Sequence, residues 1–190
     1  EELYRLHFLD SLICCTGYDF ENAIRVIDLG SGAGFPAIPL KICFPNLQFC
    51  LVESRNKRCD FLQRVIELLD FKECFVIWDR IENIAHQKEY RGVFDCAVAR
   101  AVAPLSVLLE LGVPFLRTNK GKLVALKGYS VHEEIESACR ALQMLHGVVE
   151  NVIPYCFPGE KGRHVVVISK QKETPHRFPR KPGVPAKKPL

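Results

Sequence analysis

The sequence lacks an apolar run long enough to form a membrane helix. Its longest apolar stretch, residues 102–116, is interrupted by two prolines, a glutamate and a glycine, and a bilayer requires about 20 residues. A basic-then-apolar leader is also missing, although the chain begins at Glu1 without a methionine. We therefore expect no membrane partner, and a chain that is truncated or processed from a longer one.

The nine cysteines do not form the pairs that a disulfide framework or a zinc site requires. Their number is odd, no Cys-x-x-Cys pair occurs, and most lie in apolar stretches, as Cys50 and Cys96 do. Zinc needs clustered Cys and His at ligand spacing, which the adjacent Cys14 and Cys15 do not provide. We expect reduced thiols that pack as small hydrophobic groups, no metal, and a cytoplasmic location.

The net charge of +4 is unevenly distributed along the chain. Residues 170–190 hold seven Lys or Arg, one Glu and five prolines, a composition typical of an extended, mobile arm. Such an arm suits a polyanion such as RNA, and a solubilising terminus without a partner is equally compatible. We divide the chain into a helical segment 1–20, one domain 21–170 and a basic tail 171–190.

Strand-like and helix-like segments alternate after an amphipathic stretch at residues 3–15. Buried strands are predicted at residues 24–29, 47–52, 73–77, 94–99 and 122–127, and amphipathic helices at residues 56–70 and 130–145. This alternation predicts a parallel sheet with helices on both faces.

The end of the domain departs from this alternation. Residues 148–157 and 164–169 are strand-like, and the connection between them is too short for a crossover helix. They must therefore be antiparallel neighbours. The predicted fold is α/β: a Rossmann-like class I methyltransferase fold with a mostly parallel seven-stranded sheet and a C-terminal antiparallel hairpin. A nicotinamide-binding domain would instead add further parallel strands.

The strongest local motif is Val-Ile-Asp-Leu-Gly-Ser-Gly-Ala-Gly-Phe-Pro at residues 26–36. Gly30, Gly32 and Gly34 let the backbone turn tightly against a ligand after the first strand. The dinucleotide fingerprint needs another glycine where Phe35 stands, so pyrophosphate binding is disfavoured. A ligand without phosphate, such as S-adenosylmethionine, fits better than a nicotinamide dinucleotide.

Acidic and basic residues follow the next three strands. Glu53 stands 23 positions after Gly30, where a carboxylate can accept both ribose hydroxyls of an adenosine and reject a ribose phosphate. In residues 79–82, Ile81 would pack on adenine and Glu82 or a backbone group would meet its polar edge; an ordinary helix N-terminus is the alternative. Arg100 is costly to bury unpaired, so we expect it to face the crevice.

Two acceptor-binding motifs are missing from the chain. No Asn/Asp-Pro-Pro-aromatic sequence follows the fourth strand, and no Pro-Cys nucleophile is present. The first commonly holds an exocyclic amine for methylation and the second serves carbon methylation. A ring nitrogen with a free lone pair needs neither, and requires only positioning and a suitable electrostatic setting.

Taken together, these motifs resemble the RsmG family, also called glucose-inhibited division protein B. The segments that carry the resemblance are residues 7–11 (His-Phe-Leu-Asp-Ser), 28–39, 53–54 with 57–58, 79–82, 94–101, 125–128 (Ala-Leu-Lys-Gly), 163–164 (Arg-His) and 179–183 (Pro-Arg-Lys-Pro-Gly). They span essentially the whole chain. The family usually has Asp where Glu53 stands, and it carries a helical segment ahead of residues 7–11 that is largely missing here.

The resemblance implies an enzyme that methylates ring nitrogen seven of one guanine in small-subunit ribosomal RNA. The cofactor contacts it implies are Gly30, Phe35, Glu53, Ile81, Glu82 and Arg100, with Gly32 and Gly34 in the same turn. We expect Arg100 and Lys127 to orient the base and its phosphates. The residues expected to hold the RNA backbone are Lys127, Arg163, His164, Arg180 and Lys181.

The resulting hypothesis is direct transfer of the methyl group to a splayed-out guanine by a monomeric enzyme, without a covalent intermediate. The partner is ribosomal RNA or the small subunit. Two alternatives remain open: a methyltransferase acting on a small molecule or a protein, and a non-catalytic RNA-binding or assembly factor that retains a cofactor pocket. Indifference to ribosomal RNA would favour the first, and failure to bind cofactor the second.

Overall fold

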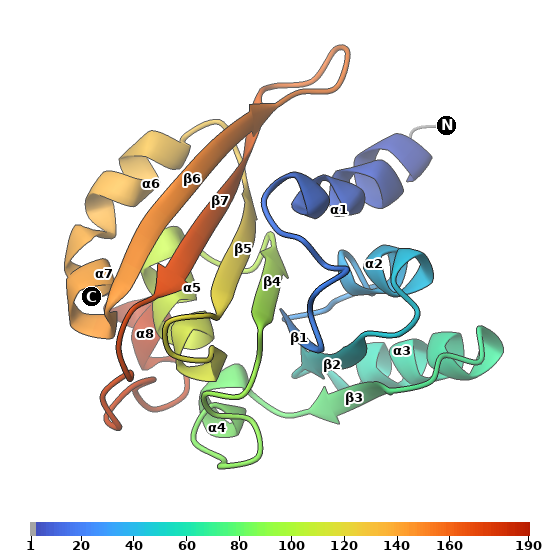
Figure 1. Cartoon of the computed structure of the whole chain (residues 1–190), viewed down its shortest axis with the longest axis horizontal. Coiled ribbons are helices and arrows are strands. Elements are labelled where there is room, and N and C mark those ends of the chain that lie inside the picture. Colours follow the sequence, from blue (N-terminus) through green and yellow to red (C-terminus); the bar gives the residue numbers. More distant parts are fainter. Residues whose placement is uncertain (1–2) are drawn as a thin grey trace.

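The computed structural model describes residues 3–190, so the first two residues of the predicted segment 1–20 lie outside the described part. A seven-stranded sheet with the order β3-β2-β1-β4-β5-β7-β6 crosses the molecule (Figure 1). Its strands are β1 (Arg25–Leu29), β2 (Gln48–Glu53), β3 (Cys74–Trp78), β4 (Cys96–Arg100), β5 (Lys122–Lys127), β6 (Gly147–Tyr155) and β7 (Arg163–Lys170). The first five strands are parallel, and β7 pairs antiparallel with both β5 and β6. The predicted fold class is confirmed.

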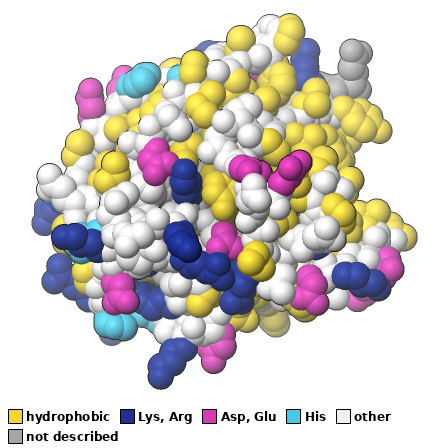
Figure 2. Space-filling view, viewed as in Figure 1, with side chains coloured by type: hydrophobic (Ala, Val, Ile, Leu, Met, Phe, Trp, Pro, Cys, Tyr) yellow, Lys and Arg dark blue, Asp and Glu magenta, His cyan; other side chains and the backbone are white. Residues whose placement is uncertain are grey.

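Helices cover both faces of the sheet. The helical elements are η1 (Tyr4–Leu9), α1 (Asp10–Leu12), η2 (Ile13–Thr16), α2 (Ala37–Cys43), α3 (Asn56–Leu68), α4 (Ile81–Ile84), α5 (Leu105–Gly112), η3 (Val113–Phe115), α6 (Val131–Ser137), α7 (Cys139–Leu145) and α8 (Val184–Lys187). On the face seen in Figure 2, apolar side chains gather around the N-terminal helical segment, where Leu3, Tyr4 and Leu9 are more than half exposed. None of the helices within residues 3–190 is long and apolar enough to cross a membrane.

Two hydrophobic cores lie on the two faces of the sheet. One joins the strands to η2, α2 and α3, and the other joins them to α4, α5, α6 and α7. Along β1, Val26 belongs to the first core while Ile27 and Leu29 belong to the second. Because side chains of a strand alternate between faces, a strand covered on both sides is apolar throughout, as the sequence pattern indicated.

The predicted helices agree in place and differ in detail. In α3, Leu62 and Ile66 are buried as expected, but Phe61 is 49% exposed and Leu69 lies beyond the helix end. The helix predicted over residues 130–145 is divided at Ala138, whose backbone (φ −93°, ψ 0°) leaves the helical region. Five of the nine cysteines are buried and four are exposed, so the packing interpretation holds for the five.

The C-terminal segment, residues 171–190, corrects the prediction of an extended, mobile arm. Phe178 is 2% exposed and Thr174 5%, Pro185 is buried, and residues 184–187 form helix α8. The Arg180 guanidinium pairs with the fully buried carboxylate of Glu110 on α5. The prediction was wrong because it counted charge and proline, whereas these few residues find partners in the domain that composition does not reveal.

Candidate active site

The glycine-rich turn after β1 is hydrogen-bonded to the end of β2. The N–H groups of Gly30 and Ser31 both donate to the carbonyl oxygen of Val52, at 2.9 and 3.1 Å. Gly34 has a φ of +91°, and a Cβ placed on it would lie 2.4 Å from Cγ1 of Ile38. Any other residue would therefore be both strained and overcrowded at position 34. The turn lies at the carboxyl edge of the sheet, where open α/β sheets bind ligands.

Glu53 holds this turn from the end of β2. One carboxylate oxygen accepts the N–H of Gly32 at 3.0 Å, and the other accepts those of Ser54 and Arg55 at 2.8 and 2.9 Å. Arg58 lies 3.5 Å from the first oxygen. Burial alone would raise the pKa of Glu53, but these N–H donors and the guanidinium outweigh it and hold the pKa below its usual range. Glu53 is therefore an anion with acceptor capacity left for a hydroxyl group.

Asp28 differs from Glu53 because its carboxylate has no partner. It is 1% exposed, and neither side-chain oxygen has a hydrogen-bond partner among the described residues. Burial raises the pKa of this carboxyl from 3.8 to about 7. Burying a carboxyl group without a hydrogen-bond partner destabilises a fold, so we expect Asp28, two residues before the glycine turn, to have a functional role.

A hollow of about 400 Å³ lies beside Glu53, and Asp28 is not among the residues that line it. It is lined by Gly30, Val52, Glu53, Ser54, Arg55, Arg58, Asp79, Arg80, Ile81, Glu82, Ala101, Val102, Ala103, Val107, Leu111, Pro185 and Ala186. Four predicted cofactor residues thus come together: Gly30, Glu53, Ile81 and Glu82. We call this the first hollow.

Glu82 lines the first hollow, but its carboxylate is already engaged. One oxygen accepts the N–H of Gly183 at 2.8 Å and a bond from the Arg80 guanidinium at 3.2 Å, and the residue is 5% exposed. Burial opposes ionisation, but these two donors hold the pKa of Glu82 below its usual range. One of its two partners, Gly183, therefore comes from the C-terminal segment, which the sequence did not predict.

A second hollow of about 430 Å³ lies next to the first, and Ala101 lines both. Its lining residues are Leu6, His7, Asp10, Arg100, Ala101, Leu126, Lys127, Gly128, Tyr155 and Arg163. Three predicted residues meet here: Arg100, Lys127 and Arg163. The hollow is closed on one side by the N-terminal helical segment, because Leu6, His7 and Asp10 belong to it.

Asp10 is the centre of a charged network in the second hollow. It is 1% exposed and accepts bonds from Arg100 at 2.9 Å, Arg163 at 3.0 Å and the Tyr155 hydroxyl at 2.8 Å. Burial, together with the charge of Asp10, raises the pKa of Tyr155, so the phenol stays protonated and donates. Arg100 also meets Nδ1 of His7 at 2.8 Å. One buried carboxylate thus fixes two arginines from β4 and β7, two strands that β5 separates.

Phe35 and Lys127 flank this network. The Phe35 ring lies 5.2 Å from the Arg100 guanidinium carbon and 5.2 Å from the His7 ring centre, within cation–π range. Lys127 donates to the Ala103 carbonyl at 2.9 Å and pairs with Glu134 at 2.6 Å. Phe35 therefore supports Arg100 rather than lining the first hollow, and Lys127 is held by groups of the domain.

The remaining predicted RNA-binding residues separate into two places. His164 stands beside Arg163, with its Nδ1 3.2 Å from the Gly128 carbonyl. Arg180 pairs with Glu110, and neither it nor the exposed Lys181 appears among the residues lining the two hollows of the described chain. The structure thus groups the β7 residues with the second hollow and places the tail residues on the α5 side.

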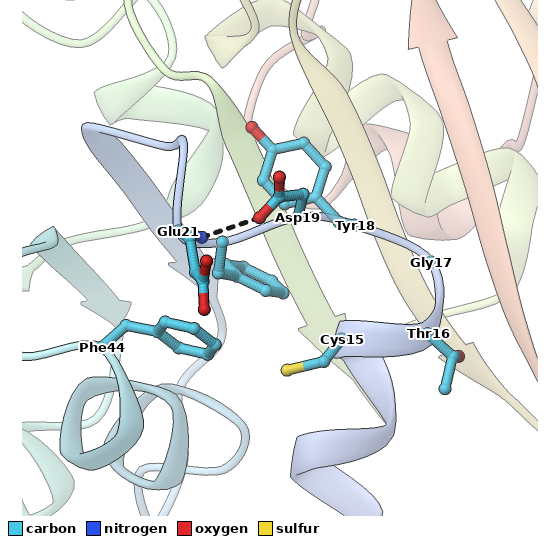
Figure 3. Close-up of a pocket in the computed structure, with 8 residues that line it drawn as sticks. Cys15, Thr16, Gly17, Tyr18, Asp19, Glu21 and Phe44 are labelled. Carbon is cyan, nitrogen blue, oxygen red and sulfur yellow. Dashed lines mark hydrogen bonds between the residues drawn. The ribbon is translucent and has the colours of Figure 1, made fainter.

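A third hollow, of about 470 Å³, lies at the opposite, amino end of the sheet (Figure 3). It is formed by the loop at residues 15–21 together with Phe44, and Asp19 caps the N–H of Glu21 within it. This hollow shares no lining residue with the other two in the described part of the chain. The candidate site is therefore the pair of hollows at the carboxyl edge.

Comparison with known proteins agrees with this geometry. Residues 1–166 match the model of the family described as "GidB: rRNA small subunit methyltransferase G". The chain belongs to the GidB family. A ribosomal RNA small subunit methyltransferase G from Streptococcus equi subsp. zooepidemicus is 44% identical over 190 residues, covering all of this chain and 80% of the relative. One from Bacillus cytotoxicus is 41% identical over 191 residues with the same coverage.

Solved structures with much lower identity share the fold of this GidB-family chain. A geranyl diphosphate methyltransferase in complex with SAM aligns with a TM-score of 0.67 at 13% identity, covering 90% of this chain and 88% of that one. The mitomycin 7-O-methyltransferase MmcR aligns with a TM-score of 0.66 at 14% identity, covering 86% and 53%. At such identities the likeness establishes the class I methyltransferase fold alone.

Among the residues that sequence reasoning missed in this GidB-family member are Asp10, Pro185 and Ala186, which line the hollows, and the buried Asp28. Asp28 and Asp10 stand inside recognised motifs, but neither was assigned a role. Pro185 and Ala186 lie in the tail that was expected to be mobile. An acid in the apolar strand 26–29 was a usable signal for Asp28. No local signal marks Asp10 or the tail residues, because their partners lie far away in the sequence.

Proposed function

We propose that this chain is an S-adenosylmethionine-dependent methyltransferase that modifies ring nitrogen seven of a guanine in small-subunit ribosomal RNA. Family membership supports the class of reaction, and the observation that carries the assignment to this site is the pair of adjoining hollows at the carboxyl edge. One hollow has the carboxylates suited to the cofactor, and the other has the cationic groups suited to a nucleotide.

The residues around the first hollow fit S-adenosylmethionine. Asp28 does not line the hollow, but it precedes the glycine turn by two residues. Its unpaired carboxylate suits the ammonium group of the methionine part, which would neutralise a buried charge. Glu53 retains acceptor capacity for the ribose hydroxyls, and the apolar side chains of Ile81 and Val102 suit a planar base. When bound, the cofactor supplies an electrophilic methyl group on a sulfonium. The chain's task is to hold that methyl group towards the second hollow.

The second hollow suits a guanine that has left its stack. Arg100 and Arg163 present N–H donors there, and guanine offers O6 as an acceptor beside the reacting nitrogen. Methylation at this nitrogen removes no proton, so the site needs no general base. Arg100 and Lys127 orient the base and its phosphates, and in-line placement across Ala101 provides the catalytic advantage.

RNA would reach this hollow along β7. Arg163 and His164 stand at its rim, and we extend the RNA-contacting surface to Arg180 and Lys181 of the C-terminal segment. Single-stranded or looped RNA is favoured, because the A-form groove hides this edge of guanine. With ribosomal RNA or the small subunit as the partner, the expected compartment is the cytoplasm.

The test is transfer of labelled methyl from S-adenosylmethionine to unmodified small-subunit RNA and, separately, to intact subunits, followed by mapping of the labelled base. We expect label at nitrogen seven of one guanine. Label on a different atom, or on protein or small molecules alone, would overturn the acceptor assignment. If S-adenosylhomocysteine does not bind in calorimetry, the chain is instead a non-catalytic RNA-binding factor.

A further inference from the structure

The C-terminal segment returns from the far edge of the sheet to the first hollow. Strand β7 ends at Lys170, which pairs with Gly147 at the amino edge. From there residues 171–190 cross the α4–α5 side of the molecule and end in α8, next to α5. The hollow's opposite wall, built by Gly30 and Glu53, belongs to the carboxyl edge. The segment therefore spans the height of the domain.

This path is fixed by hydrogen bonds to backbone carbonyls of the segment. The Arg91 guanidinium donates to the carbonyl oxygens of Thr174 and Phe178, each at 2.9 Å, and of Pro175 at 3.2 Å. Nε2 of His86 lies 2.7 Å from the Pro179 carbonyl. These contacts depend on backbone atoms, so a proline-rich sequence satisfies them well and they left no pattern in the sequence.

Two buried carboxylates hold the part nearest the hollow. Glu110 accepts the N–H of Arg180 at 2.8 Å and its guanidinium at 2.6 and 2.9 Å. Glu82 accepts the N–H of Gly183 at 2.8 Å. Immediately after Gly183, Pro185 and Ala186 form part of the lining of the first hollow. Glu82, which lines the hollow, thus holds the part of the C-terminal segment that also lines it.

We propose that residues 180–186 form the wall of the cofactor site against which the adenine ring packs, and that Glu82 is a positioning residue acting through this wall. The proposal rests on the proposed function, because it requires S-adenosylmethionine in the first hollow. Glu53 marks the ribose end, so the base lies farther along, between Ile81 and Pro185. Glu82 then shapes the adenine pocket by fixing Gly183 rather than by meeting the base.

The proposed wall is tested by adding a bulky side chain to the space beside it in the first hollow. Ala186 is exposed and lines the hollow, so Ala186→Trp adds bulk where adenine would lie without disturbing the core. Lys187→Trp adds the same bulk one residue away, at an exposed position outside the hollow lining. We expect the Kd for S-adenosylhomocysteine, measured by calorimetry, to rise at least tenfold in A186W and to stay within twofold in K187W. Thermal unfolding of both variants should match the wild type.

Two outcomes distinguish a failure of the proposed wall from a failure of the proposed methyltransferase function. If wild-type protein binds no S-adenosylhomocysteine, the proposed function fails and the wall fails with it. If the wild type binds and A186W binds within twofold of it, the wall alone is overturned.

The positioning role of Glu82 has its own readout. Glu82→Ala should raise the KM for S-adenosylmethionine at least fivefold with kcat changed less than twofold, whereas Glu82→Gln, which keeps an acceptor for Gly183, should recover most of the KM. A fall in kcat at saturating cofactor, or no rescue by Gln, would overturn it.

Discussion

The two terminal segments of the chain each line one of the two hollows, but they are attached to the domain in different ways. The N-terminal helical segment supplies Leu6, His7 and Asp10 to the second hollow, and the C-terminal segment supplies Pro185 and Ala186 to the first. The N-terminal segment is held by arginines that themselves line the hollow it closes. The C-terminal segment is held mainly by Arg91 and Glu110, which lie outside both hollows.

With the cofactor in the first hollow and the acceptor in the second, as proposed, this difference would separate acceptor chemistry from cofactor affinity. Loosening the N-terminal attachment releases Arg100 and Arg163 together, so the geometry around the reacting base should change at once. Loosening the C-terminal attachment should move Pro185 and Ala186, which line the first hollow, and leave the arginines in place. Variants at the two ends should therefore affect different kinetic constants.

The largest expected effect is that of Asp10→Asn. The amide keeps the size of the side chain but removes the buried charge that two half-buried guanidinium groups share, and truncating one partner of a buried charge pair costs about 2–5 kcal/mol. We expect methyl transfer to fall about 100-fold, which corresponds to about 2.7 kcal/mol, with the Kd for S-adenosylhomocysteine within threefold of wild type. Single-turnover transfer and calorimetry measure the two quantities.

Asp19→Asn is the matched control for this variant. Asp19 is an exposed carboxylate in the loop after the same helical segment, and its side chain lines the hollow at the amino edge instead. D19N should transfer methyl groups at the wild-type rate. Equal losses in D19N and D10N, or a D10N enzyme with normal transfer, would contradict the role assigned to the N-terminal attachment.

Asp28 adds a third case to the comparison, because its carboxylate forms no hydrogen bond with either terminal segment in the described chain. Asp28→Asn should weaken S-adenosylmethionine binding about tenfold or more, since it removes the anion expected to meet the ammonium group. The same change should stabilise the ligand-free protein at pH 8 by about 1 kcal/mol or more, seen as a Tm about 3 °C higher. Opposite signs for binding and stability are expected where a fold retains an unfavourable charge for function.

The pH dependence of unfolding tests whether ionised Asp28 destabilises the folded state. The folded-state pKa of Asp28, about 7, lies above its unfolded value of 3.8, so the folded state binds more protons between these values. The contribution of Asp28 to stability is therefore fully present below pH 3.8 and is lost as the pH rises through 7. The Tm difference between D28N and wild type should grow from pH 4 to pH 8. A constant difference would show that Asp28 is not the titrating group.

A smaller effect is expected when the C-terminal attachment is cut. Arg180→Met leaves Glu110 buried without its partner, and breaking a buried pair costs about 3 kcal/mol of unfolding free energy. The Kd for S-adenosylhomocysteine should rise about fivefold, while kcat at saturating cofactor stays within twofold. Lys187→Met removes the same charge from an exposed position and should change neither constant. A drop in kcat for R180M with an unchanged Kd would reverse the division between the two ends.

The part of the site that was predicted from sequence is the part encoded locally. The glycine turn depends on residues within a single βα connection, and Glu53 follows it at a recognisable interval. The central strands β1, β2, β4 and β5 were located because they are buried on both faces and therefore apolar almost throughout. These features require no knowledge of which distant segment lies beside them.

The part that was missed depends on distant partners. Asp10 meets residues 90 and 153 positions away, and Arg180 meets Glu110 across 70. A buried aspartate and a surface one look alike in sequence, and so do a docked basic segment and a free one. The composition gave the charge of the tail correctly. Whether Phe178 and Pro185 are buried is decided by distant contacts, those of Phe178 with the core that includes α4 and α5 and those of α8 with α5.

The smallest predicted effect concerns Tyr155, the uncharged side chain that donates to Asp10 within residues 3–190. Tyr155→Phe removes a hydroxyl that donates to Asp10 at 2.8 Å and leaves both arginine bonds in place. The expected cost is about 1 kcal/mol of unfolding free energy, the value of one net hydrogen bond, with transfer reduced no more than threefold. If Y155F instead matches the 100-fold loss expected of D10N, the orientation of the Asp10 carboxylate controls the reaction. The charge of Asp10 would then be secondary, and the N-terminal segment would act through geometry, as the C-terminal one does.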